Sequence, residues 1–295
     1  MHVIKNRLGV CCITLGLGHK SDFKTLQLNR TKDLANKEEK IFGVYKHNLA
    51  ELCKVLTYLS SKNIRHYRIS SNMFPLADHP DFSHYWDKFC SNESYWNHAK
   101  IAVSKYLDNN GRLSTHPDQF CIISSGKDDV NSNGVRNLEY HAKMFDMLGI
   151  PQSHFCPINI HVSNGNSPEI AIRKVDHNLT RLSDSVMKRL VFETEDKSFW
   201  KYQNLHKYFP NIPITLDYHH RLINNDGEDE QVAHDVCVST WKDVTPLFHH
   251  SEGKAHSLDR AHADYINKLP ECSYDVDIEI EAKQKDLAVL KLFNI

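Results

Sequence analysis

Short apolar runs alternate with longer amphipathic stretches along this 295-residue chain, and this alternation constrains the fold more than any other feature. A short apolar run bounded by turn residues is typical of a buried strand, whereas apolar side chains spaced three and four residues apart indicate a helix. The helical spacing is clear at Leu49, Leu52, Val55, Leu56 and Leu59. The pattern therefore predicts a succession of strand-then-helix units.

About eight such units are expected, which implies a parallel sheet and suggests a closed (β/α)8 barrel. The expected strands are 7–15, 64–69, 112–115, 154–162, 190–193, 212–216, 245–249 and 276–280. The expected helices are 47–61, 95–107, 135–148 (ended by Gly149), 168–186, 199–208, 232–239, 261–268 and 282–293. An open doubly wound sheet is the alternative, but its usual Gly-rich first turn is not formed by Gly9, Gly16 and Gly18. The predicted fold is an α/β TIM barrel, a single domain over residues 1–295.

Composition places the chain among ordinary globular proteins. Apolar residues make up 40% and charged residues 25% of the sequence, enough for a sizeable core. The formal net charge of −1 gives no overall attraction to nucleic acid, so a DNA-binding function would need a local basic groove. We find no secretory segment, no membrane span and no Cys-x-x-Cys pair among the eight cysteines. These features favour an intracellular protein with reduced thiols.

Polar side chains recur where the predicted strands end, which is the catalytic face of a (β/α)8 barrel. Six consecutive strands, from the third to the eighth, deliver His, Asp or Glu to this rim, and the loop after the second strand adds one His. The residues expected there are His79, His116, His161, Glu193, Asp217, His220, His249 and Glu281. Twenty histidines in the chain fit such a rim, although many are expected to be ordinary surface residues.

These residue types favour a cation site. Imidazole with carboxylate, without thiolate, suits Zn²⁺, Mn²⁺ or Fe²⁺. The number of ligands exceeds what one ion uses, so we expect two or three ions. Alternatively, the carboxylates pair with Lys or Arg across the barrel mouth. No matching set of Lys or Arg occurs at the strand ends, and carboxylates gathered without cations would repel one another.

Gln119 and Phe120 directly follow the His116 loop, so a side-chain amide and an aromatic ring stand next to each other in the sequence. Such a pair could enter a duplex and replace displaced bases. Alternatively, Phe120 packs in the core.

Taken together, these residues resemble the ATP-independent UV damage endonucleases, in the barrel group that includes endonuclease IV and xylose isomerase. The resemblance covers nearly the whole chain. The matching segments are Arg-Leu-Gly at 7–9, Tyr-Arg-Ile-Ser-Ser at 67–71, Phe-Pro-Leu at 74–76, His-Pro at 79–80 with Ser83, His-Pro-Asp-Gln at 116–119, Ile-His-Val at 160–162, Phe-Glu-Thr-Glu-Asp at 192–196, Asp-Tyr-His-His at 217–220, His-Ala-Asp-Tyr-Ile at 262–266 and Ile-Glu-Ala-Lys-Gln-Lys-Asp at 280–286.

The resemblance implies a trinuclear site, usually assigned as manganese, with Zn²⁺ or Mg²⁺ as alternatives. The ligands carried onto this chain are His79, His116, His161, Glu193, Asp217, His220, His249, His262 and Glu281. His256 competes with His262 for one of these places. The expected catalytic residues are Glu193, Asp217, Glu281 and His116. The lesion-probing pair falls on Gln119 and Phe120.

The chain departs from the family pattern at three positions. A modified lysine of some members aligns with Leu247, an aromatic residue of the first strand with Val10, and the tyrosine of the probing pair with Phe120. These differences bear on lesion stacking more than on hydrolysis.

The resulting hypothesis is hydrolysis of one DNA strand immediately 5′ to a UV photoproduct, leaving a 3′-hydroxyl. The expected partner is double-stranded DNA carrying UV lesions, bound by a monomer with no nucleotide cofactor and no membrane. The expected location is the cytoplasm or nucleoid of a prokaryote, or otherwise a nucleus or viral factory. Residues available for phosphate contacts are Lys100, Lys105, Arg112, Lys127 and Lys254. The rival functions are an abasic-site endonuclease, a sugar isomerase or epimerase, and a non-catalytic metal-binding or DNA-binding protein.

Overall fold

A ring of eight parallel strands forms the centre of the molecule. The computed structural model describes residues 7–18, 20–31, 36–162, 167–197, 199–225 and 227–293. The strands are β1 (Leu8–Cys11), β2 (His66–Ile69), β3 (Arg112–Thr115), β4 (Ile158–His161), β5 (Leu190–Glu193), β6 (Ile214–Thr215), β7 (Leu247–His250) and β8 (Asp277–Ile280). Their order is β6-β5-β4-β3-β2-β1-β8-β7, and a parallel bridge between Asp217 and His249 joins the two ends of the sheet. The expected α/β barrel is confirmed.

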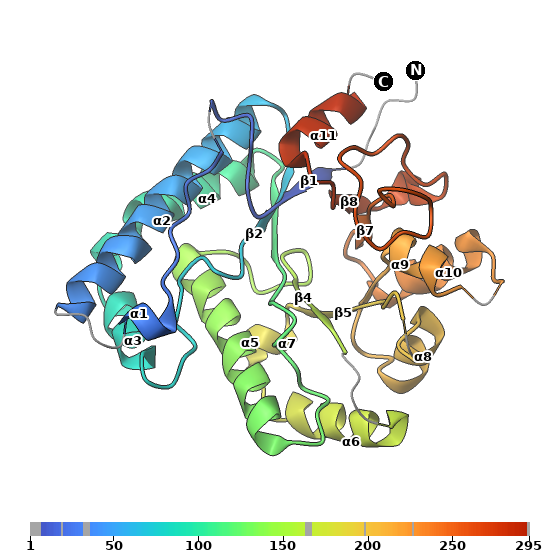
Figure 1. Ribbon diagram of the computed structural model, residues 1–295, viewed down its shortest axis with the longest axis horizontal. Helices are drawn as coiled ribbons and strands as arrows, with labels where there is room; N and C mark the ends of the chain where they lie inside the picture. The colour runs from blue at the N-terminus through green and yellow to red at the C-terminus, as the bar shows by residue number, and fades with distance from the viewer. Residues whose placement is uncertain are drawn as a thin grey trace.

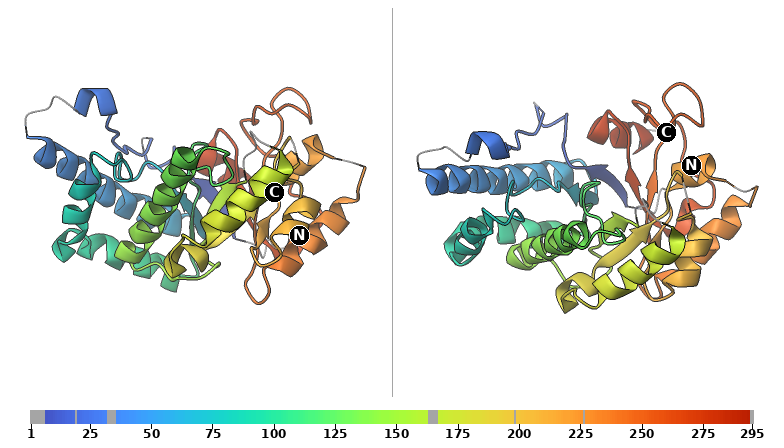
Figure 2. Two further views of the ribbon diagram at one scale, coloured as in Figure 1. Left: turned by 90° about the horizontal axis from the view of Figure 1, so that it is seen from below. Right: turned by 60° about the horizontal axis from the view of Figure 1, so that its bottom comes forward.

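Helices surround this ring on its outer side. They are α1 (Leu28–Thr31), α2 (Lys37–Ser61), α3 (Ser83–Cys90), α4 (Asn97–Asp108), α5 (Asp128–Leu148), α6 (Pro168–Leu179), α7 (Asp184–Met187), α8 (Tyr202–Tyr208), α9 (Tyr218–Ile223), α10 (Glu230–Thr240) and α11 (Lys285–Phe293), with 3-10 turns η1 (Glu93–Tyr95) and η2 (Ser273–Asp275). Figure 1 shows the long helices α2, α4 and α5 on one side of the strands and the shorter α8, α9 and α10 on the other. The two further views in Figure 2 show the same division. No helix in the described ranges has the length and apolar character needed to cross a bilayer.

The helix boundaries follow from local sequence. α6 begins with the Ser167 hydroxyl accepting a hydrogen bond from the amide of Ile170, and Pro168 occupies its first turn, where no amide hydrogen is needed. α5 ends at Gly149, whose φ of 74° is readily adopted only by a residue without a side chain. The predicted end of this helix is therefore confirmed.

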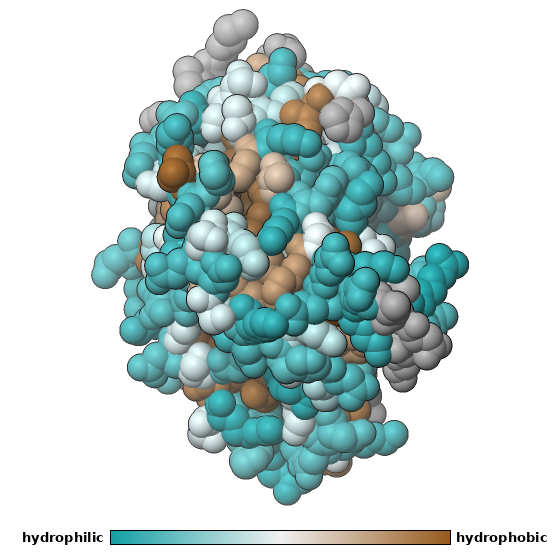
Figure 3. Space-filling view, turned by 90° about the vertical axis from the view of Figure 1, so that its left-hand side faces the viewer, coloured by the Kyte–Doolittle hydropathy of each residue, from teal (hydrophilic) through white to brown (hydrophobic). Residues whose placement is uncertain are grey.

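An aromatic cluster holds the loop after β2 against the outer helices. The Phe74 ring lies 5.2 Å from that of Tyr45 on α2, 4.8 Å from Trp86 on α3 and 5.3 Å from Trp96. The face of the molecule over these helices is largely hydrophilic, with hydrophobic side chains visible mainly in its recesses (Figure 3). This packing anchors loop 70–82, which carries His79.

Two helix predictions are wrong. Residues 261–268 are not helical, because Gly253 and His262 form an antiparallel bridge and the amides of Lys283 and Gln284 donate to the carbonyls of Ala263 and Asp264. The predicted helix 168–186 is two helices, α6 and α7. The strand predicted at 7–15 is shorter, as β1 ends at Cys11.

A buried ion pair closes the N-terminal end of the barrel. Arg112 opens β3 and is fully buried, and its Nη1 lies 2.9 Å from Oδ2 of Asp277, the first residue of β8. The same carboxylate oxygen lies 3.0 Å from Nη1 of Arg7. Because this is the end of the barrel opposite His116, the prediction that Arg112 contacts phosphate is wrong.

Replacing Asp277 with Ala should lower the free energy of unfolding by about 3–5 kcal/mol, because Arg112 would remain as a buried charge without its partner. Urea unfolding of the purified protein measures the difference. The matched control is Glu38→Ala, which removes the exposed ion pair with Lys88 and should cost about 1 kcal/mol or less. Equal losses in the two variants would contradict the structural role of Asp277.

Candidate metal centre

Seven of the predicted ligands meet at the C-terminal ends of the strands. They are His116 after β3, His161 at the end of β4, Glu193 at the end of β5, Asp217 after β6, His220 in α9, His249 in β7 and Glu281 after β8. Alternate residues of a strand face the same side of the sheet. The candidate ligands at the strand ends therefore face the barrel interior, as do the side chains two residues before them. The strand ends therefore bring residues from 116 to 281 into one site.

Glu193 is the centre of this site. Its Oε2 lies 3.0 Å from Nε2 of His116 and 3.2 Å from Nδ1 of His249. Its Oε1 lies 3.4 Å from Nδ1 of His220 and 3.8 Å from Nε2 of His161. Burial opposes ionisation of Glu193, but its interactions with the surrounding histidines, that with His249 foremost, outweigh it and hold the pKa of the carboxyl well below its usual value. Four imidazoles thus surround one carboxylate.

Asp217 has an oxygen that no protein donor satisfies. Its Oδ1 caps α9 by accepting hydrogen bonds of 2.8 Å from the amides of His219 and His220. Its Oδ2 has no hydrogen-bond partner among the described residues, although Asp217 is fully buried. A buried carboxylate oxygen without a donor is costly unless a cation binds it. Ligand atoms of Asp217, Glu193 and His220 all lie within 4.8 Å of one another, so these residues fit a divalent ion.

A second group of ligand atoms shares Glu193. His116, His161 and Glu193 also offer atoms within 4.8 Å of one another. The His116 Nδ1 lies 2.7 Å from the carbonyl oxygen of Pro117, to which it donates a hydrogen bond. This bond directs the Nε2 toward Glu193, as outer hydrogen bonds orient metal-binding histidines. Two overlapping groups around one carboxylate are the arrangement that neighbouring ions use.

The protonation of the histidines differs with their surroundings. Burial lowers the pKa of His161 to about 4, which favours the neutral imidazole that binds cations. Burial also opposes protonation of His220, but Asp217 and Glu193 outweigh it and raise the pKa of His220 to about 9. His249, between Glu193 and a second carboxylate, likewise has a raised pKa despite its burial. Binding of a divalent ion to these residues would therefore release protons.

Glu281 is paired with an arginine that the sequence analysis did not consider. Arg68 lies inside β2, and its Nη1 is 2.6 Å from Oε1 of Glu281 and 2.9 Å from Oε2 of Glu279. Burial would raise the pKa of Glu281, but Arg68 and His249 outweigh it and lower the pKa to about 2. The expectation that no arginine reaches the carboxylates is therefore wrong for Glu281. Arg68 also pairs with Glu279, which lies two residues earlier, in β8.

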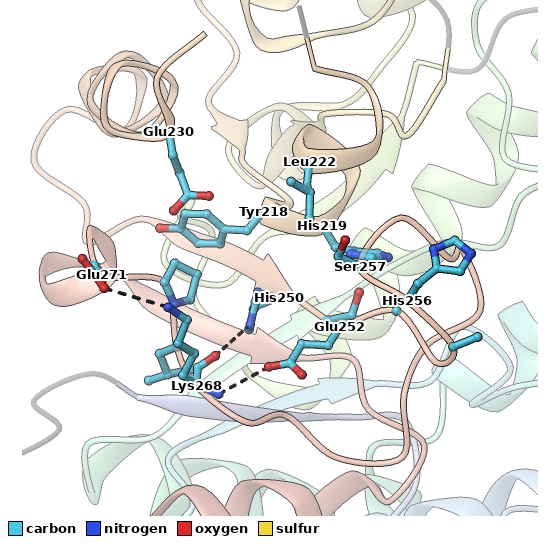
Figure 4. Close-up of a pocket in the computed structure, with 15 residues that line it drawn as sticks. Tyr218, His219, Leu222, Glu230, His250, Glu252, His256, Ser257, Lys268 and Glu271 are labelled. Atoms are coloured by element: carbon cyan, nitrogen blue, oxygen red, sulfur yellow. Dashed lines mark hydrogen bonds and ion pairs between the residues drawn. The ribbon is translucent and has the colours of Figure 1, made fainter. Parts of the chain in front are cut away.

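The geometry favours His262 over His256. The Nδ1 of His262 lies 3.8 Å from Oε2 of Glu281, because the bridge to Gly253 holds this segment at the barrel mouth. His256 instead lines a neighbouring cavity of about 540 Å³ with Tyr218 and Glu252 (Figure 4). The assignment of His262 as a ligand stays a prediction.

His79 has only local contacts among the described residues. Its Nδ1 accepts a hydrogen bond of 3.2 Å from the amide of Asp81, and its ring lies 5.5 Å from that of Phe82. No described contact joins His79 to Glu193 or Glu281, and its place among the ligands stays a prediction.

Gln119 and Phe120 lie exposed on the β3–α5 loop. Phe120 is 73% exposed, and its amide donates to the side chain of Asp118, which shapes the turn. The alternative that Phe120 packs in the core is therefore excluded. The probing role of Gln119 and Phe120 stays a prediction.

Three supporting residues escaped the sequence analysis. The Asn159 side-chain amide donates to Oε2 of Glu193, while Arg68 and Glu279 form the pairs described above. Each lies two residues from another interior position, so strand alternation was the signal that could have found them. Val10 and Leu247, two of the three departures from the family pattern, are both buried apolar residues.

The family profile and the curated relatives that match this chain agree on one description. A family profile described as UV-endonuclease UvdE matches residues 6–294. The UV DNA damage endonuclease of Bacillus cereus strain B4264 is 30% identical over 303 aligned positions, which cover 98% of this chain and 93% of that protein.

Solved structures agree over the same length. SacUVDE superposes with a TM-score of 0.83 at 30% identity, covering 98% of this chain and 97% of its own. Endonuclease IV from Thermus thermophilus has a TM-score of 0.60 at 11% identity, with the same coverage of both chains. The 3-keto-D-glucoside 4-epimerase of E. coli has a TM-score of 0.55 at 10% identity, covering 98% and 100%. The last two show only a shared fold.

Substitution should separate the two candidate histidines. His262→Ala is expected to lower Mn²⁺ affinity or the number of ions bound, because His262 faces Glu281. His256→Ala, the matched control, should bind Mn²⁺ as the unmodified chain does. Calorimetric titration with elemental analysis measures both quantities, and saturating Mn²⁺ at 100 times its dissociation constant should add about 2.7 kcal/mol of stability per site. If only His256→Ala lowers Mn²⁺ affinity or the number of ions bound, His256 rather than His262 is the ligand.

Proposed function

Because the chain belongs to the UV-endonuclease UvdE family, we propose that it is a metal-dependent endonuclease that nicks DNA immediately 5′ to UV photoproducts and leaves a 3′-hydroxyl. The family supports a repair endonuclease acting on UV damage. The cleavage position, the product and the metal dependence are the proposal. The lesions proposed are pyrimidine dimers and 6-4 photoproducts in double-stranded DNA, bound by a monomer inside the cell.

The observation that carries the metal dependence is the unsatisfied oxygen of Asp217 next to Glu193. Two groups of ligand atoms share Glu193, which supports two or three ions, proposed as Mn²⁺ with Zn²⁺ or Mg²⁺ as alternatives. Bound divalent ions would supply Lewis acidity toward a phosphodiester and its leaving oxygen. The protein would supply a rigid set of ligands, because each sits at a strand end or helix start.

Selectivity for damage is proposed to come from the β3–α5 loop. Damaged bases stack poorly, so displacing them from the duplex costs less than displacing intact ones. The exposed ring of Phe120 could fill the space left in the stack, and the Gln119 amide could contact an unpaired base.

The purified, Mn²⁺-loaded protein should nick a duplex carrying a single pyrimidine dimer on the 5′ side of the lesion. A DNA polymerase should extend the product directly, because its end is a 3′-hydroxyl. The undamaged duplex of the same sequence is the control. Preference for an abasic duplex would support an endonuclease IV-like activity instead. If the protein binds Mn²⁺ but nicks none of these duplexes, the endonuclease proposal is rejected.

Glu193→Ala should reduce incision by a factor of roughly 10³ or more, because all the central imidazoles lose their shared carboxylate. Binding to the irradiated duplex should fall far less. A gel-based incision assay and a fluorescence-anisotropy titration measure the two quantities. The control is Glu38→Ala on the outer face of α2, which should change neither. Equal losses of incision and binding for Glu193→Ala would mean that Glu193 only maintains the fold.

Phe120→Ala should weaken binding to damaged duplex by about 1–3 kcal/mol, the usual contribution of one aromatic side chain stacked on a base. Binding to undamaged duplex should change less. Ile101→Ala is the matched control, since Ile101 is 54% exposed on α4. An equal effect of both substitutions would contradict the probing role.

A further inference from the structure

Glu279 is a buried carboxylate whose oxygens are already occupied by protein donors. It lies in β8 and is completely buried. Its Oε1 accepts from the Ser114 hydroxyl and lies 3.2 Å from Nε2 of His66. Its Oε2 lies 2.9 Å from Nη1 of Arg68 and 3.1 Å from Nε2 of His249. Glu279 differs in this respect from Asp217, whose Oδ2 accepts no hydrogen bond from the described residues.

These contacts leave no room for an ion at Glu279 itself. Ligand atoms of Cys11, Glu279 and Glu281 lie within 4.8 Å of one another, so by spacing alone they could hold a cation. The Nη1 of Arg68, however, already bonds to both carboxylates, at 2.9 and 2.6 Å. An arginine is always charged, so Arg68 already provides a cation between the two carboxylates, in the place a metal would take. Glu279 therefore acts through its protein partners.

The partner that matters for the metal centre is His249. One side of its ring, Nε2, points to Glu279, while Nδ1 lies 3.2 Å from Oε2 of Glu193 and 3.7 Å from Oε1 of Glu281. Because Nε2 must carry a hydrogen to donate to Glu279, Nδ1 is the nitrogen that can bind an ion. His116 has the reverse arrangement, with its Nδ1 on a backbone carbonyl and its Nε2 at the centre.

The surroundings hold Glu279 in this position. His66 is completely buried, and a Cβ on Gly9 of the neighbouring strand would lie 2.2 Å from its Nδ1. Only a glycine on β1 leaves space for the imidazole that bonds to Glu279. Donors from β2, β3 and β7 converge on this single carboxylate, so neither it nor His249 can turn without breaking several bonds.

We infer that Glu279 is a positioning residue: it holds His249 so that Nε2–H faces down the barrel and Nδ1 is presented, as the ligand atom, to an ion beside Glu193 and Glu281. This inference rests on the proposed function, because it concerns the same metal centre. A carboxylate behind a metal-binding histidine commonly raises metal affinity by fixing the ring and its proton.

Zinc is the probe for the test, because it is diamagnetic and allows NMR of ¹⁵N-labelled histidine. The signals of His249 are identified because they are missing from the spectrum of His249→Gln. In the zinc-loaded unmodified protein, these signals should show that His249 carries its proton on Nε2 and binds zinc through Nδ1. Calorimetry should show that Glu279→Leu lowers zinc affinity by about 100-fold and Glu279→Gln, which keeps an acceptor for Nε2–H, by about 10-fold. Ser114→Ala, the matched control, removes one donor to Glu279 without touching His249 and should have a much smaller effect.

Two results would overturn the inference: coordination of zinc through Nε2 of His249, or zinc affinity in both Glu279 variants equal to that of the unmodified protein. Circular dichroism on each variant shows whether it folds, and Glu279→Gln keeps the test decisive if Glu279→Leu does not. Incision of irradiated DNA is measured separately. If the spectrum shows binding through Nδ1 and no DNA is cut, the proposed function fails alone. If DNA is cut and the Glu279 variants bind zinc normally, the positioning role fails alone.

Discussion

Burial of carboxylates inside the barrel is the constraint on which the rest of this structure depends. Asp277, Glu279 and Glu281 alternate along β8 and its end, so all three point into the ring of strands. A buried charge is tolerated only when it is paired and hydrogen-bonded. Arg112 pairs with Asp277 at the N-terminal end of the barrel. Arg68 pairs with Glu279 and Glu281, which lie closer to the C-terminal ends of the strands.

The pairing becomes less complete toward the C-terminal ends of the strands. Glu193 is surrounded by imidazoles, which can exchange a proton for a metal ion, rather than by guanidinium groups, which cannot. Asp217 keeps an oxygen, Oδ2, that accepts no hydrogen bond from the described residues, and the Nδ1 of His220 lies 3.8 Å from it. The carboxylates are thus paired with arginine at the N-terminal end of the barrel, whereas at the C-terminal end Glu193 and Asp217 lie among histidines in the arrangement of a candidate metal centre.

The shared barrel explains why the similar structures include both nucleases and an epimerase. At 10–11% identity, endonuclease IV and the E. coli epimerase show only that the fold is common. The exposed Phe120, to which we assign the selectivity for damaged DNA as a proposal, lies outside the ring of strands on the β3–α5 loop. The candidate ligands lie at the strand ends, and in barrels of this kind the loops can vary without disturbing the residues that the strands hold.

The sequence by itself determined the barrel and most of the candidate centre, because strand period and barrel geometry together dictate that strand ends meet. This sufficed for His116, His161, Glu193, Asp217, His220, His249 and Glu281. The sequence did not show that Arg112 is buried, because its partner Asp277 is distant in the chain. It also wrongly predicted a helix at 261–268, because the bridge between Gly253 and His262 is not visible in the local pattern. Only the tertiary structure shows that Arg68 pairs with Glu281, that Glu279 contacts His249 and that His262 rather than His256 lies near Glu281. Each of these depends on which side chains from different strands fill the same space, and local periodicity carries no information about that.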